Sequence, residues 1–274
     1  MSVEHIVVGL DDAQASWTAL RWAANRAADG ATNVEIVHVM ESADAVAVRA
    51  RLAEAAAFVR TTAPGATVTT AVHRGLAADV LVRAAASVEL LVIGAHRTRR
   101  IRSAATGSTP ERIATMATVP TVVVPDDWTF GTGPVVIGID AGTGGRALAF
   151  GLQEARRAGR TAQLVHAWKV TAPVAAHPLA LVEDPSGADA ESARLVLNAA
   201  SRAAADLEPT VPTRAALWEG DAGEALAKAA VEASLIVIGR RHRTMIGGEL
   251  FGSVGRRTMH RSKTALVTVP EPTA

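Results

Sequence analysis

The 274-residue chain contains no cysteine, and its net charge is only +1. The absence of cysteine excludes disulfide bonds and metal sites built on thiolates. The near balance of acidic and basic residues provides no overall field that would favour a nucleic acid or a membrane surface as partner. Aromatic residues make up 3% of the chain, and no basic surface interleaved with aromatics suggests RNA binding.

Long apolar runs are also missing. No stretch approaches the roughly 20 residues that a bilayer-spanning helix needs. The first residues, Met-Ser-Val-Glu-His-Ile-Val-Val-Gly, lack the charged and apolar regions of a secretory signal. We therefore expect a soluble protein located in the cytoplasm.

Several catalytic and cofactor motifs do not occur. Gly-x-Ser-x-Gly, His-Glu-x-x-His and Gly-Lys-[Ser/Thr] are absent, which removes support for a serine hydrolase, a zinc protease or a P-loop enzyme. Gly-x-Gly-x-x-Gly does not follow the first apolar segment, which argues against NAD binding.

Short apolar segments alternate with segments of helical periodicity. In the first half, strands are predicted at 5–10, 34–40, 66–72, 89–93 and 120–125. Helices are predicted between them: one begins near Ser16 and ends at Gly30, and others cover 43–60, 77–86 and 110–116. This alternation predicts right-handed β-α-β crossovers and a mostly parallel sheet.

The same plan begins again after a turn-rich linker at 126–133. Gly94 and Gly239 are 145 residues apart, as are Gly107 and Gly252. We therefore predict a tandem duplication with domains at 1–127 and 134–274. Gly9 and Gly138 are only 129 residues apart, so the second half holds 16 additional residues. We expect these in an irregular loop near 169–189, which is either a functional or mobile segment or a tolerated surface insertion.

One loop in each half is suited to bind an anion. In the first half a strand leads to Gly94, and the loop ends at Gly107, where the missing Cβ permits close approach of a ligand. Ser108 or Thr109 then provides a helix N-cap, and Pro110 suits the first helical turn. The N–H groups of a helix start and the helix dipole favour negative charge.

A ligand is expected beyond the carboxyl ends of the strands, where the strand order reverses. If the first and fourth strands are neighbours, Asp11 lies opposite the loop of Gly94 to Ser108. Asp140 lies in the same way opposite the loop of Gly239 to Ser253. A carboxylate for a sugar hydroxyl or Mg²⁺, facing a loop that accepts phosphates, predicts a nucleotide site.

These motifs resemble those of the universal stress protein family, and the resemblance covers nearly the whole chain. Nucleotide-binding members carry Gly, two residues, Gly, nine residues, Gly, then Ser or Thr. The first and last glycines of that motif are present in both halves, as are Val-Gly-Leu-Asp11, Ile-Gly-Ile-Asp140 and the histidine segments around His38 and His166. The resemblance implies two Rossmann-like sheets of strand order 3-2-1-4-5 in tandem, ATP in the crevice, and dimers paired through the fifth strand.

The resemblance also implies roles for particular residues. Asp lies near the nucleoside, the end of the second strand lies near adenine, and the glycine loop surrounds the phosphates. The nucleotide-binding residues that the resemblance implies are Leu10, Asp11, Val39, Gly94, Arg97, Gly107, Ser108 and Thr109 in the first half, and Ile139, Asp140, Ala167, Gly239, His242, Gly252, Ser253 and Val254 in the second.

The chain departs from the motif at its middle glycine, which is Arg97 in one half and His242 in the other. A side chain there either crowds the phosphate path or adds a cation to it. Further cations lie in both loops, at Arg99, Arg100 and Arg102 and at Arg240, Arg241 and Arg243. The alternative interpretation is a pair of solvated basic loops beside an empty or closed crevice.

The sequence thus favours a stress-response regulatory module that binds an adenine nucleotide, with ATP, alone or together with Mg²⁺, as the cofactor. An interaction scaffold without nucleotide and a weak ATP hydrolase remain alternatives, although no catalytic partner for Asp11 or Asp140 is evident. The expected assembly is an intramolecular pseudo-dimer, with a homodimer possible.

Overall fold

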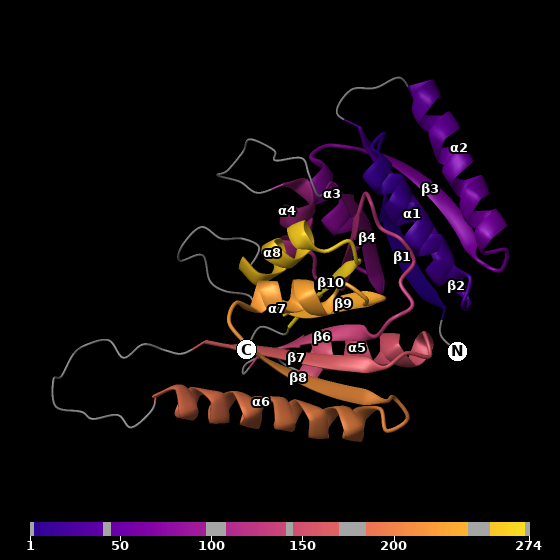
Figure 1. Ribbon diagram of the computed structural model, residues 1–274. Helices are drawn as coiled ribbons and strands as arrows, with labels where there is room; N and C mark the ends of the chain where they lie inside the picture. Colours follow the sequence, from indigo (N-terminus) through magenta and orange to yellow (C-terminus); the bar gives the residue numbers. More distant parts are fainter. Residues whose placement is uncertain are drawn as a thin grey trace.

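The computed structural model describes residues 3–40, 45–96, 108–140, 145–169, 185–240 and 253–271. Ten strands form one sheet in the order β3-β2-β1-β4-β5-β10-β9-β6-β7-β8 (Figure 1). Each neighbouring pair is parallel except β5 and β10, which are antiparallel. The α/β class and the mostly parallel sheet that the sequence predicts are confirmed.

Both halves build the same set of elements. The strands of the first half are β1 (Glu4–Gly9), β2 (Thr32–Met40), β3 (Thr67–Arg74), β4 (Leu90–Ala95) and β5 (Thr121–Pro125). Its helices are α1 (Gln14–Ala27), α2 (Ala45–Thr62), α3 (Ala77–Ala84) and α4 (Thr109–Met116). The strands of the second half are β6 (Val135–Ile139), β7 (Ala162–Trp168), β8 (Thr213–Glu219), β9 (Leu235–Arg240) and β10 (Leu266–Pro270). Its helices are α5 (Gly145–Arg157), α6 (Pro185–Leu207), α7 (Ala222–Ala229) and α8 (Ser253–Arg261).

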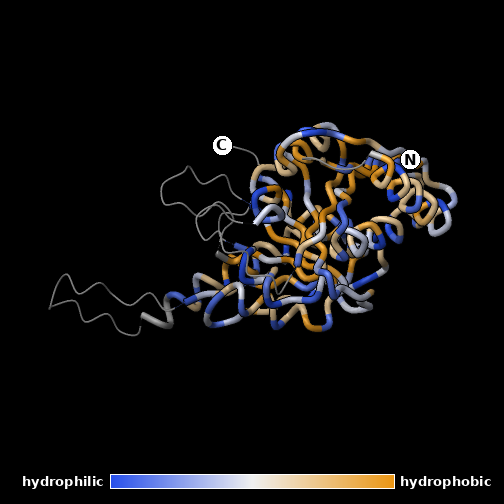
Figure 2. The backbone as a smooth tube through the Cα atoms, turned by 90° about the horizontal axis from the view of Figure 1, so that it is seen from above, coloured by the Kyte–Doolittle hydropathy of each residue, from blue (hydrophilic) through white to orange (hydrophobic). Residues whose placement is uncertain are grey.

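Helices cover both faces of the sheet and divide the core into two layers. One layer packs α1, α2, α5 and α6 on the sheet, and the other packs α3, α4, α7 and α8 on the opposite face. The central strands are accordingly mostly apolar, as is usual for strands covered on both faces. The tube in Figure 2 shows these apolar segments gathered inside the molecule.

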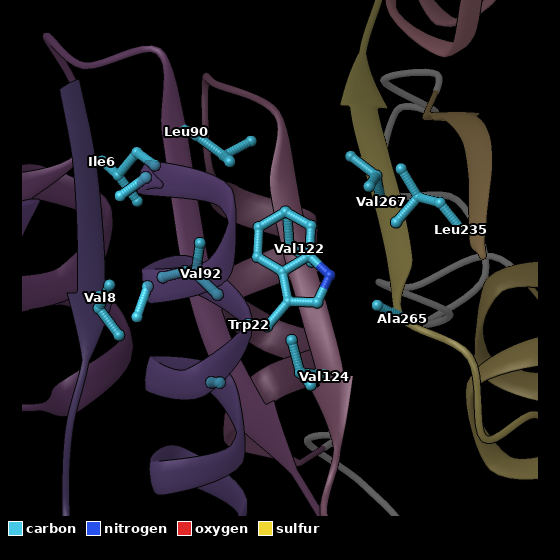
Figure 3. Close-up of a cluster of buried hydrophobic side chains, with 14 of the residues drawn as sticks. Ile6, Val8, Trp22, Leu90, Val92, Val122, Val124, Leu235, Ala265 and Val267 are labelled. Carbon is cyan, nitrogen blue, oxygen red and sulfur yellow. The ribbon is translucent and has the colours of Figure 1, made fainter. Parts of the chain in front are cut away.

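The prediction of two separate five-stranded sheets is wrong, because β5 and β10 join the halves into one sheet. Val122 lies in register with Val267, and Thr121 with Thr268. Figure 3 shows Val122 and Val267 on these neighbouring strands, with Trp22 of α1 beside β5. An apolar edge strand exposes unpaired N–H and C=O groups, and pairing the two edges satisfies both sets.

A buried ion-pair network is a second link between the halves. Arg26 of α1 is 8% exposed and donates to Glu154 of α5, with Nη2 to Oε1 at 2.8 Å. The same Nη2 lies 2.8 Å from Oε1 of Glu4, and Arg157 of α5 donates to Oε2 of Glu4 at 3.0 Å. Arg157 also donates to the main-chain oxygen of Arg26 at 2.6 Å. Helices from the two halves therefore meet through alternating charges.

Two helix boundaries differ from the predictions. Ser16 lies inside α1, whose N-cap residue is Ala13, and its hydroxyl donates to the main-chain oxygens of Asp11 and Ala13. The helix ends at Ala27, before Gly30. Of the predicted irregular loop at 169–189, residues 170–184 lie outside the described residues, and α6 begins at Pro185.

Candidate functional site

The loops after β1 and β4 meet at one end of the sheet. The two strands are parallel neighbours, with Val8 in register with Val92, so their carboxyl ends lie side by side. The chain proceeds from β1 to β2 and β3 in one direction and places β4 and β5 in the other. This is the reversal of strand order at which open α/β sheets form ligand crevices. In the second half, β6 and β9 are related in the same way.

Gly94 is a point of close packing between β4 and the start of α1. A Cβ placed on Gly94 would lie 2.2 Å from the carbonyl carbon of Ala15 and 2.5 Å from the nitrogen of Ser16. The first turn of α1 therefore rests directly on the end of β4. Packing between these two backbones is a sufficient reason for glycine here, independent of any ligand.

Asp11 lies exposed at the carboxyl end of β1. Its Oδ1 accepts the N–H of Ala13 at 2.9 Å, and its own N–H donates to the hydroxyl of Ser16 at 3.1 Å. These bonds hold the carboxylate beside the start of α1. Asp140 is likewise exposed, at the end of β6.

A histidine closes the end of the first strand in each half. Nδ1 of His38 lies 2.8 Å from the main-chain oxygen of Leu10, and Nδ1 of His166 lies 2.8 Å from that of Ile139. Both side chains are more than nine-tenths buried. Each histidine therefore fixes the main chain just after β1 or at the end of β6. The next residues along β2 and β7, Val39 and Ala167, are half-buried.

The start of α4 is held by a capping box. Ser108 is the N-cap residue, and Glu111 accepts the Ser108 N–H through Oε2 at 3.2 Å. Glu111 is 9% exposed, and its Oε1 lies 3.3 Å from Nε2 of His260 on α8. The sequence prediction omitted Glu111, although Ser-x-x-Glu is a recognised signature of a helix start. Thr109 is exposed as the first residue of the helix.

The start of α8 has a different electrostatic environment. Its first turn contains Ser253 and Val254 and no acidic residue, followed by Arg256 and Arg257. Arg257 donates to Asp221, the N-cap residue of α7. This hydrogen bond lowers the pKa of Asp221 and raises that of Arg257. An ion pair thus links α8 to the start of α7.

Arg240 does not face a phosphate site, contrary to the suggestion that it grips phosphate. From the end of β9 it donates through Nη1 to the main-chain oxygen of Thr115 and through Nη2 to that of Ala117. These carbonyls belong to the C-terminal end of α4, in the other half. Burial lowers the pKa of Arg240. The side chain caps a helix across the joined sheet, where the helix dipole favours a cation.

Some predicted site residues lie outside the described residues. These are Arg97, Gly107, His242 and Gly252, together with Arg99, Arg100, Arg102, Arg241 and Arg243. The described residues of the predicted site lie at or beside the carboxyl ends of strands and at helix starts: Leu10, Asp11, Val39, Gly94, Ser108 and Thr109 in the first half, and Ile139, Asp140, Ala167, Gly239, Ser253 and Val254 in the second.

Surface depressions, metal ligands and membrane-spanning helices bear on what the described part of the chain can bind. A depression of about 410 Å³, lined by residues 27–31 and 63–65, lies at the amino ends of β2 and β3, opposite the crevice. Within the described ranges, no group of three His, Asp or Glu side chains is placed to hold a metal ion. No helix in that part of the chain is long and apolar enough to cross a membrane.

The topology defines a tandem α/β protein with one reversal of strand order in each half. The model of the universal stress protein family matches residues 2–125 and 132–270. The chain therefore belongs to the universal stress protein family. No curated protein matches it.

Solved structures share the fold along almost the entire chain. A universal stress protein from Archaeoglobus fulgidus is 14% identical, with a TM-score of 0.68 over 97% of this chain and 96% of its own. A functionally unknown protein from Pseudomonas aeruginosa is 17% identical, with a TM-score of 0.67 over 98% of this chain and 93% of its own. At these identities the likeness concerns the fold.

Proposed function

We propose that the chain is a stress-response regulatory module of the cytoplasm that binds an adenine nucleotide. The nucleotide that we propose is ATP, bound together with Mg²⁺. It acts through occupancy: a nucleotide bridges the loops after the first and fourth strands of a half and changes the surface those loops present. The two domains, 1–127 and 134–274, form an intramolecular pseudo-dimer.

The observation that carries this proposal is the pairing of an exposed carboxylate with a helix start at one crevice. Asp11 and Asp140 lie at the ends of strands that neighbour β4 and β9, and those strands lead toward α4 and α8. A carboxylate can accept from ribose hydroxyls or hold Mg²⁺, while helix N–H groups and arginines bind phosphate oxygens.

Solved family members include adenine-nucleotide complexes, one with cAMP and one, from Archaeoglobus fulgidus, with dAMP. Each aligns with about half of this chain, at a TM-score below 0.5. Those ligands belong to those proteins. The proposal for this chain depends on its own crevice residues.

Isothermal titration of the full chain with Mg-ATP tests the proposal, with the double variant Asp11→Ala/Asp140→Ala as comparison. We expect heat of binding for the wild type and at least about a tenfold loss of affinity in the variant, since each carboxylate contributes a charge-assisted hydrogen bond or a metal contact. Absence of heat, together with absence of nucleotide in the purified protein, would reject the proposal. Glu191→Ala, on the exposed surface of α6, serves as the matched control.

A further inference from the structure

The depression of about 410 Å³ at the amino ends of β2 and β3 lies between the ends of two helices. Helices α1 and α2 pack side by side on one face of the sheet, and both end at this edge (Figure 1). The lining residues, 27–31 and 63–65, are alanine, glycine and proline apart from Asp29. Nothing lies within 4 Å of the Cβ positions of Gly30 and Gly65, so there is free space beside both glycines.

Two helix ends give this depression a negative potential. The last four carbonyls of an α-helix have no N–H partner within the helix, and the macrodipole places partial negative charge there. The ends of both α1 and α2 contribute such carbonyls. Asp29 adds a full negative charge, and its side chain is 62% exposed. Arg60, in the last turn of α2, donates instead to the main-chain oxygen of Val68 on β3 at 3.2 Å.

A cation of the protein already binds at the end of α1. Nη2 of Arg157, from the second half, donates to the main-chain oxygen of Arg26 at 2.6 Å, and its Nε lies 3.8 Å from Oδ2 of Asp29. The ion pairs here join two guanidinium groups to three carboxylates, a net charge of −1: Arg26, Arg157, Glu4, Asp29 and Glu154. The depression is therefore suited to a further cation.

The lining favours an organic cation over a metal ion. A divalent metal ion needs several oxygen ligands, and in the described part of the chain no three His, Asp or Glu side chains are grouped to provide them. An ammonium group has three N–H donors, which suit the Asp29 carboxylate and the carbonyls of the helix ends. Its methylene groups can pack on the alanines and on Pro64, as the stem of a lysine does on apolar surface.

We propose that this depression is a binding site for a small aliphatic amine, whose ammonium group is held by Asp29 and the ends of α1 and α2. The site is separate from the nucleotide crevices and does not depend on the proposed function. It belongs to the first half alone, because the corresponding turn between α5 and β7, residues 158–161, contains no carboxylate and includes Arg160. One amine per chain is therefore expected.

A nuclear magnetic resonance titration of the full chain with 1,4-diaminobutane tests the site. We expect saturating shifts of the amide signals of residues 27–31 and 63–65 and unchanged signals at 158–161. Asp29→Asn should weaken binding at least about fivefold, because it removes the charge that pairs with the ammonium group. Gly65→Leu fills the depression and should abolish the shifts.

Matched controls separate this site from general attraction of amines to acidic surface. Gly145→Leu adds the same side chain at another open glycine, Glu191→Gln removes another exposed carboxylate, and both should keep wild-type affinity. The uncharged 1,4-butanediol should cause no shifts. Equal affinity in wild type and Asp29→Asn, or binding that persists in Gly65→Leu, would overturn the proposal.

A capped tripeptide, acetyl-Gly-Lys-Gly-amide, tests the other source of an ammonium group, a lysine of a partner protein. We expect it to bind more weakly than the diamine, because its backbone extends beyond the depression. Tighter binding of the peptide would assign the site to a protein partner and overturn the small amine as its ligand. None of these outcomes changes the test of the proposed function, which uses Mg-ATP and the crevice carboxylates.

Discussion

Gly94 shows how a single residue serves packing where its motif suggested ligand binding. It is the first glycine of the loop motif, yet the atoms nearest to its absent Cβ are main-chain atoms of Ala15 and Ser16. A side chain at this position has no flexible neighbour to displace, because both close contacts are backbone. The start of α1 depends on this contact for its position, and with it the Asp11 carboxylate.

Gly94→Ala is expected to destabilise the protein by about 2–3 kcal/mol, because the added methyl forces α1 away from β4. The free energy of unfolding in urea measures the change. Gly65→Ala is the matched control: nothing lies within 4 Å of its Cβ position, so its effect should be within about 0.5 kcal/mol. Equal stability of the two variants would show that α1 does not rest on β4.

The starts and ends of α4 and α8 distinguish the two halves at the level of elements. Both helices follow the same loop in the same register, but α4 begins with a capping box, whereas the first turn of α8 contains no acidic residue. The C-terminal end of α4 receives Arg240 from the second half, with both terminal nitrogens bonded to its carbonyls. The repeat therefore preserves the backbone plan and changes its electrostatics.

Arg240→Met should lower stability by about 1–3 kcal/mol, since it removes the donors of two carbonyls at the end of α4. Thermal or urea unfolding measures the loss. Arg202→Met, on the exposed surface of α6, removes the same charge and should have an effect within about 0.5 kcal/mol. An unchanged midpoint for Arg240→Met would mean that water replaces the arginine at no cost.

The whole molecule is held together by the β5–β10 pairing and by the network of Arg26, Glu4, Glu154 and Arg157. Burial would raise the pKa of Glu4, but its pairs with Arg26 and Arg157 outweigh burial and leave the pKa below its ordinary value. Burial likewise works to lower the pKa of Arg26, and its two carboxylate partners raise it overall. The side chains of Glu4 and Arg26 are therefore both ionised in the folded chain at neutral pH.

Glu4→Gln is expected to lower stability at pH 7 by about 1–2 kcal/mol, because it leaves part of a buried cation uncompensated. The pKa of Glu4 is lower in the folded state, so its contribution is present above the unfolded value near 4.3 and is lost as pH falls through the folded value. The gap between wild type and variant should therefore narrow from pH 5 toward about pH 3. Urea unfolding across this range measures it, and Glu191→Gln should show no comparable gap. A stability difference between wild type and Glu4→Gln that grows toward low pH would contradict this prediction.

Much of the architecture was predictable because it depends on local periodicity. Short apolar runs between helical segments specify strands covered on both faces, and the 145-residue repeat specifies two copies of one plan. The place of the crevice follows from the same pattern, because parallel strands bring their carboxyl ends to one edge. Ser108 as N-cap was visible in the chain, and Glu111 three residues later carried a readable signal that the prediction overlooked.

The contacts between the halves depended on the tertiary structure. No local pattern states that the edge of β5 pairs with β10, nor that Arg240 reaches α4 or that His260 meets Glu111. These partners are more than 100 residues apart in sequence. Sequence alone determined which elements form and which residues repeat, because those depend on neighbours along the chain. Only the folded molecule decided which edges and charges meet, because unpaired backbone groups and buried ions are satisfied by whatever the fold brings near them.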